Sequence, residues 1–162
     1  MSQSRVILGI DPGIADTGYG VIKVNGSTVR CLAYGSIKTS SKINLMARLE
    51  TLHQELLLIL DTYQPDLVSV EELFFSKNVK TAITVGEARG VILLAIQERG
   101  CSLVEFKPSQ VKQAVASYGA ATKEQVQRMV KTILGLKKIP KPDDAADALA
   151  LAICALNKPL IR

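Results

Sequence analysis

The chain has 162 residues, of which 48% are hydrophobic and 22% are charged, and this composition excludes disordered, collagen-like and repetitive architectures. Twenty basic residues against fifteen acidic ones give a net charge of +5, which favours an anionic partner. The three cysteines lie far apart and there is a single histidine, His53, so a zinc finger, a disulfide framework and a thioredoxin-like site are excluded. We therefore expect one domain covering residues 1–162, whose chemistry rests on carboxylates.

Nothing in the sequence marks the chain for export or for a membrane. Its first residues contain no apolar run of the kind found in signal peptides. The longest apolar stretch, residues 148–156, is well short of the roughly 20 residues that span a bilayer. We expect a cytoplasmic protein that has no membrane partner.

Short apolar runs rich in β-branched residues predict five strands, at residues 5–11, 17–24, 28–39, 67–71 and 102–106. The pair Asn25-Gly26 is typical of a tight hairpin turn between the second and third strands. Apolar residues at helical spacing predict five helices, at residues 43–63, 79–99, 108–117, 123–134 and 143–156.

The predicted order of elements is β-β-β-α-β-α-β-α-α-α. Three strands joined by hairpins, followed by strands joined through helices, imply a mixed five-stranded sheet that is antiparallel on one side and parallel on the other. Helices are expected on both faces of this sheet, so the fold class is α/β. In such sheets ligands gather outside the carboxyl ends of the parallel strands.

Two acidic residues stand at those strand ends. Asp11 closes the first strand and Glu71 closes the fourth, and the order of elements makes these strands neighbours. Each acid ends an apolar run, where burial makes an unpaired carboxylate costly and a bound metal ion would offset the cost. The alternative interpretation is that each acid merely begins a turn.

A third acidic group lies in the last predicted helix. Asp144 and Asp147 are three residues apart, so their side chains share one face of the helix, and Asp143 is four residues from Asp147. Acids in a first turn also complement the helix dipole, and Asp143, which follows Pro142, is typical of an N-cap. Asp147 is harder to explain in that way, because it interrupts an alanine- and leucine-rich segment that should be buried, where an acid needs a partner.

Converging carboxylates without histidine or thiolate form an oxygen-rich site that suits Mg²⁺ or Mn²⁺. Two such ions roughly 4 Å apart can hydrolyse a phosphodiester. The positive charge is also localised: residues 107–141 contain eight basic residues and one acid, a net +7, which leaves the rest of the chain at −2. A block of one sign is typical of nucleic-acid contacts, although a solvated helix face is the alternative. Phe74 and Phe75 follow Glu71, and either could stack on bases or pack into the core.

Five collinear segments resemble the RuvC family of Holliday junction resolvases: ILGIDPGIADTGYGVI at residues 7–22, VEELFFSKN at 70–78, GEARGVILLA at 86–95, QVKQAV at 110–115 and DAADALALAI at 144–153. The resemblance implies an RNase H-like fold and a Mg²⁺-dependent endodeoxyribonuclease that resolves four-way junctions by paired symmetric nicks in recombination and repair. It implies four catalytic, metal-binding acids: Asp11, Glu71, Asp144 and Asp147. Asp143 lies outside this quartet, which favours its interpretation as a cap.

The resemblance has further implications for contacts. Phe74 is expected to contact junction bases, and Lys112 and Lys123 are expected to handle DNA. Family members act as homodimers alongside a branch-migration motor complex of the RuvA and RuvB type. The apolar helix around residues 90–96 is the expected dimer contact, although burial in the core would explain its pattern equally well.

Three other functions are compatible with parts of the pattern. An actin- or hexokinase-like ATP-binding fold also opens on Asp-x-Gly, but it needs two duplicated halves, and 162 residues supply one. A related RNase H-like nuclease that processes RNA would share the acids but should lack the segments at residues 86–95 and 110–115. A non-catalytic junction-binding protein would not need the complete acid quartet.

Overall fold

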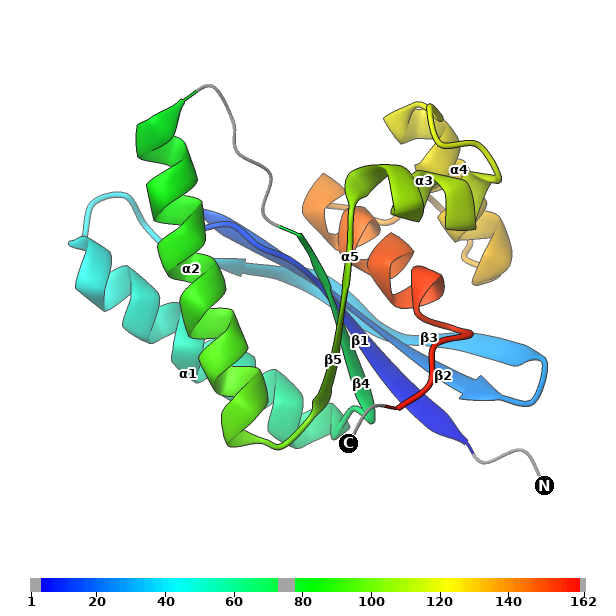
Figure 1. Ribbon diagram of the computed structural model, residues 1–162, viewed down its shortest axis with the longest axis horizontal. Helices are drawn as coiled ribbons and strands as arrows, with labels where there is room; N and C mark the ends of the chain where they lie inside the picture. Colours follow the sequence, from blue (N-terminus) through cyan, green and yellow to red (C-terminus); the bar gives the residue numbers. More distant parts are fainter. Residues whose placement is uncertain (1–3, 73–77, 161–162) are drawn as a thin grey trace.

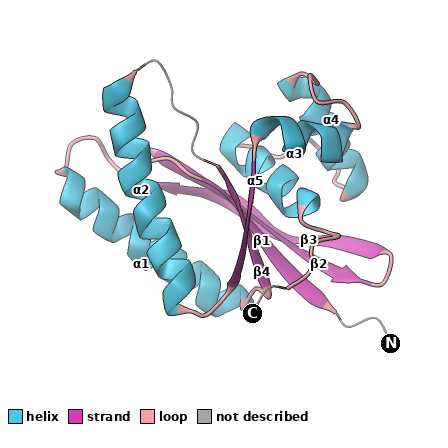
Figure 2. Ribbon diagram, in the orientation of Figure 1, coloured by secondary structure: helices cyan, strands magenta, loops and turns pink. Residues whose placement is uncertain are grey.

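The computed structural model describes residues 4–72 and 78–160, and within them a five-stranded mixed sheet is flanked by helices on both faces (Figures 1 and 2). The strand order across the sheet is β3-β2-β1-β4-β5. The strands are β1 (Arg5–Asp11), β2 (Asp16–Asn25), β3 (Thr28–Lys38), β4 (Leu67–Glu71) and β5 (Ser102–Phe106). The helices are α1 (Leu45–Tyr63), α2 (Val79–Glu98), α3 (Pro108–Ala116), α4 (Lys123–Ile133) and α5 (Asp143–Cys154).

The pairing of the strands confirms the mixed sheet predicted from the sequence. β1 pairs antiparallel with β2 and parallel with β4, and β4 pairs parallel with β5. Predicted and observed elements agree within two residues at each end. For example, α1 begins at Leu45 rather than at residue 43, because the side chain of Asn44 accepts a hydrogen bond from the backbone N–H of Ala47 and caps the helix.

Two hydrophobic cores lie on the two faces of the sheet. On one face, α1 and α2 cover alternate residues of the central strands, among them Leu8 and Ile10. On the other face, α3, α4 and α5 pack together, and α5 lies against β1 and β2 (Figure 1). Because side chains alternate along a strand, Asp11 points to the same face as Ile7, which belongs to the core beneath α5. Within the described residues, none of the helices has the length and apolar character needed to cross a bilayer.

Glycines let α5 lie unusually close to the sheet. A Cβ placed on Gly9 would collide with the backbone carbonyl of Ala148, and one placed on Gly18 would collide with that of Asp144. A Cβ on Gly20 would meet the side chain of Leu149. These strand positions therefore accept only glycine while α5 keeps its place, and the N-terminal turn of α5 is held against the ends of β1 and β2.

Candidate active site

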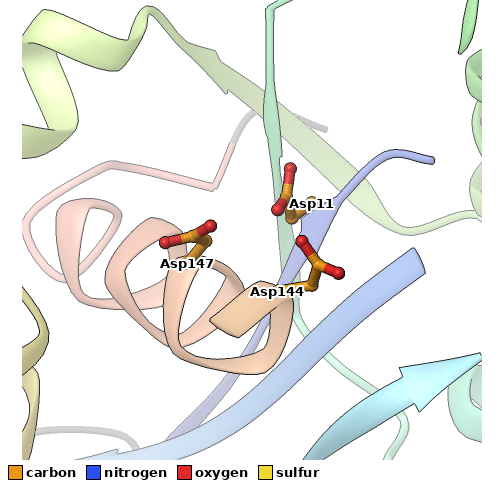
Figure 3. A group of neighbouring side chains, drawn as sticks. All are labelled: Asp11, Asp144 and Asp147. Carbon is orange, nitrogen blue, oxygen red and sulfur yellow. The ribbon is translucent and has the colours of Figure 1, made fainter. Parts of the chain in front are cut away.

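Three aspartates meet where β1 ends and α5 begins. Asp11, Asp144 and Asp147 each offer a carboxylate oxygen, and these oxygens all lie within 4.8 Å of one another (Figure 3). All three side chains are half-buried. The structure thus brings together three of the four acids singled out in the sequence.

The local fold explains why these residues meet. Asp11 is the register partner of Gly18 on β2, and the backbone of Asp144 rests directly on that glycine. Asp147 follows on the next turn of α5, on the same face as Asp144. The close approach of α5 to the sheet therefore carries two acids to the end of β1.

The fourth acid, Glu71, lies next to this group. Ile10 pairs with Val70 in the parallel register, so Asp11 and Glu71 end adjacent strands. Glu71 is not part of the three-aspartate cluster, but it lines a pocket of about 250 Å³ together with Asp147. Its charge also reaches Asp11, since it is the strongest of the charges that disfavour ionisation of that residue.

Burial and mutual repulsion disfavour the ionised forms of the acids. Burial first, and then the negative charges of Glu71, Asp147 and Asp144, raise the pKa of Asp11 to about 8. Burial and the charge of Asp147 raise the pKa of Glu71. Burial also raises the pKa of Asp147, although Lys123 opposes this effect. A divalent cation among these oxygens would counter the repulsion between them and favour their ionised forms.

Both lysines predicted to handle DNA border the same pocket. Lys112 and Lys123 line it together with Glu71 and Asp147, and apolar residues such as Val126 complete the lining. The Nζ atom of Lys123 lies 3.3 Å from Oδ2 of Asp147. Partial burial lowers the pKa of Lys123, but the charge and hydrogen bond of Asp147 outweigh it and the pKa is raised. Most other basic residues of the 107–141 block are exposed, just before α3, on α4 or in the loop that follows α4.

The prediction that Asp143 caps the last helix is wrong. The N-cap position is Pro142, and Asp143 is the first helical residue, with no side-chain capping hydrogen bond. The carboxylate instead accepts hydrogen bonds from Lys141 Nζ at 3.0 Å and Gln127 Nε2 at 3.3 Å. Nearby ammonium and amide donors from α4 and the preceding loop attract the side chain more strongly than the helix N–H groups do.

The predictions for the phenylalanine pair and for the apolar stretch of α2 remain to be compared with the structure. Phe74 and Phe75 lie outside the described residues. The apolar residues of the stretch 90–96 on α2 do not share one environment. Ile92 and Ile96 are buried in the core, whereas Leu94 is exposed and remains available for a dimer contact. The sequence did not predict two features of the site. One is the direct ion pair between Lys123 and Asp147, for which the sequence carries no signal. The other is the close packing of Asp144 on Gly18, which a glycine inside a strand could have indicated.

The donor set fits a hard divalent cation. Carboxylate oxygens at this spacing are the ligands that Mg²⁺, Mn²⁺ and Ca²⁺ prefer, and the described part of the site contains no histidine or thiolate that would favour zinc. The negative charges of Glu71, Asp144 and Asp147 repel that of Asp11. A bound cation would relieve this repulsion, which favours cation binding at the site. Lys112 and Lys123 beside the acids suit a phosphate group.

Comparisons with known proteins show the family to which the chain is related. The family profile described as crossover junction endodeoxyribonuclease RuvC matches residues 7–155. A protein of that name from Heliobacterium modesticaldum is 58% identical over 94% of both chains. The structure of Thermus thermophilus RuvC in complex with a Holliday junction substrate superimposes with a TM-score of 0.88, at 42% identity, over 93% of this chain and 92% of that one. A yeast mitochondrial Holliday junction resolvase shares the fold at 15% identity, with a TM-score of 0.66 over 91% of this chain and 77% of that one. The chain belongs to the RuvC family of crossover junction endodeoxyribonucleases.

Proposed function

We propose that this chain is a Mg²⁺-dependent endodeoxyribonuclease that resolves four-way DNA junctions by paired nicks in recombination and repair. The observation that carries the proposal is the convergence of Asp11, Asp144 and Asp147 beside two lysines in a member of the RuvC family. The match to a relative whose structure contains a Holliday junction supports the substrate.

In this proposal the four acids, Asp11, Glu71, Asp144 and Asp147, hold two Mg²⁺ ions, with Mn²⁺ as a substitute. When bound, such ions activate water and stabilise the leaving oxygen of a phosphodiester. The chain's own residues do the rest. The acids fix the ions against β1 and α5, while Lys112 and Lys123 bind and orient the phosphate backbone of the strand to be cut.

Three further properties belong to the same proposal. Phe74 contacts junction bases, the protein acts in the cytoplasm beside a branch-migration motor of the RuvA and RuvB type, and residues 1–162 form one nuclease domain. Cutting two opposed strands requires two active sites, so we propose a homodimer. Its contact is the exposed apolar stripe of α2, where Val79, Ile83 and Leu94 are 69%, 58% and 53% exposed. Gly90 lies on the same stripe and leaves open space above it.

A substrate comparison with an active-site variant tests the activity. Wild-type protein and Asp11→Asn are incubated with Mg²⁺ and a four-way junction, a linear duplex or a structured RNA. We expect paired symmetric nicks on the junction alone, and we expect Asp11→Asn to bind the junction without cutting it. Equal cleavage of plain duplex would refute resolvase specificity, and cleavage of the RNA would favour the RNA-processing alternative. Cleavage by Asp11→Asn would remove that residue from the catalytic group.

The dimer contact is tested separately. Leu94→Glu places a charge at the C-terminal end of the proposed stripe without disturbing the core, because the side chain is exposed. We expect the variant to elute as a monomer in size-exclusion chromatography with light scattering and to lose paired nicking. Leu58→Glu on α1, where the wild-type side chain is 60% exposed, is the matched control and should leave the mass unchanged. A Leu94→Glu protein that remains dimeric would place the contact elsewhere.

A further inference from the structure

Asp143 is the acid of the α5 segment that the proposed function does not use, and it is heavily engaged. Its Oδ1 accepts hydrogen bonds from Lys141 and Gln127, and its Oδ2 lies 3.7 Å from Nζ of Lys123. Asp143 therefore contacts two ammonium groups and one amide donor. It is not one of the three aspartates whose oxygens cluster.

Lys123 stands between two carboxylates that lie one turn apart on α5. Its Nζ is 3.3 Å from Asp147 Oδ2 and 3.7 Å from Asp143 Oδ2, and these are its ion pairs within the described residues. Asp147 belongs to the acid cluster and Asp143 does not. Lys123 is thus shared between a carboxylate of the candidate metal site and one outside it.

We propose that Asp143 is a positioning residue that draws Lys123 partly away from Asp147 and so keeps Asp147 available to a divalent cation. The inference rests on the proposed function, in which Asp147 binds metal. The ammonium group and the metal ion are competitors for the same carboxylate, since both are cations that approach its oxygens. A second anion on the outer side of Lys123 reduces the ammonium group's preference for Asp147, so the ion displaces it at lower concentration.

The arrangement does not serve chiefly to stabilise the fold. The side chains of Lys123 and Asp143 are 54% and 50% exposed, and ion pairs that face solvent contribute little to stability. What the contact does determine is where a positive charge stands relative to the acid cluster. Gln127, which is buried, fixes Asp143 to α4, the helix that also carries Lys123.

A double-mutant cycle on metal binding tests the inference. Mn²⁺ binding to the DNA-free, full-length protein is measured by calorimetry for the wild type, Asp143→Asn, Lys123→Gln and the double variant. We expect Asp143→Asn to weaken Mn²⁺ binding about two- to fivefold when Lys123 is present, the range of a solvent-exposed ion pair. With Lys123→Gln the same substitution removes only the direct field of one carboxylate outside the acid cluster, so its effect should be clearly smaller.

Two matched variants complete the design. Asp143→Glu restores the charge and should bind Mn²⁺ nearly as the wild type does, and Asp61→Asn, on an exposed acid that pairs with Arg99 far from the site, should leave Mn²⁺ binding unchanged. Equal fold-changes for Asp143→Asn in both backgrounds would overturn the positioning role, because they would reflect general charge alone. A wild type that binds no Mn²⁺ would overturn the proposed function as well, so the two failures are distinguishable. Thermal unfolding of each variant confirms that it is folded.

Discussion

The contact between β2 and α5 leads to a sharp prediction for Gly18→Ala. The added Cβ would lie 2.0 Å from the backbone carbonyl oxygen of Asp144, whereas such atoms do not approach closer than about 3.0 Å. The obstacle is helix backbone rather than the end of a flexible side chain. The N-terminal turn of α5 must therefore move away from β2 by at least about 1 Å.

That displacement acts on stability and on the site in different ways. Overpacking a well-filled interior costs typically about 1–3 kcal/mol of unfolding free energy. A shift of about 1 Å in a residue that positions reacting groups can cost about 100-fold in rate. Because Asp144 shares the cluster with Asp11 and Asp147, we expect the loss of cleavage to exceed what the loss of stability explains.

The assay compares Gly18→Ala with Gly119→Ala, where the nearest atoms to an added Cβ would lie at ordinary contact distances of 3.7 and 3.8 Å. Urea denaturation gives the free energy of unfolding, and single-turnover cleavage of a four-way junction at saturating Mg²⁺ gives the rate. The Gly18 variant should be folded, bind the junction and cut it slowly, while the Gly119 variant should match the wild type in both measurements. Wild-type cleavage by Gly18→Ala would refute the view that this glycine sets the position of Asp144.

Two further predictions concern charged groups. In metal-free protein the pKa of Asp11, about 8, lies above its ordinary value of 3.8. Between these pH values the folded state therefore holds a proton that the unfolded state has lost. The free energy of unfolding should fall as pH rises from about 4 to about 8. Asp11→Asn should lose this part of the pH dependence in denaturation curves, and equal slopes for the two proteins would contradict the prediction. Arg89 on α2 pairs with Glu105 on β5, so Arg89→Met should leave Glu105 unpaired and cost about 1–3 kcal/mol in urea denaturation. The double variant Arg89→Met/Glu105→Leu should recover most of this loss, and a double variant as unstable as the single one would show that the pairing is not the cause.

The order of the strands was predictable because it follows from local signals and one topological rule. Alternating and continuous apolar runs marked the strands, Asn25-Gly26 marked the hairpin, and helical connections between strands imply parallel neighbours. From these, the adjacency of Asp11 and Glu71 at the ends of β1 and β4 followed without further information. The ends of helices were less predictable, since a cap such as Asn44 competes with neighbours of similar propensity.

The detailed geometry of the site depended on contacts between segments distant in the chain. That Asp144 and Asp147 share a helix face is a property of spacing, and the sequence sufficed for it. That the face is turned toward Asp11 depends on the fit of α5 against Gly9 and Gly18, which no pattern within α5 reveals. The misassignment of Asp143 has the same origin, because its partners on α4 and in the loop before α5 are distant from the helix N–H groups that a cap would bind.

The clustered acids at the end of β1 suit the binding of a metal ion but lower the stability of the metal-free fold. Burial raises the pKa values of Asp11, Glu71 and Asp147, which means that folding without a cation brings like charges together or forces protons onto them. The chain offsets part of this cost with Lys123, but an ammonium group that neutralised Asp147 fully would also hold the carboxylate against a metal ion. Sharing Lys123 with Asp143 is an intermediate arrangement, in which the metal-free fold keeps a partner for Asp147 and the metal ion still has a carboxylate to bind.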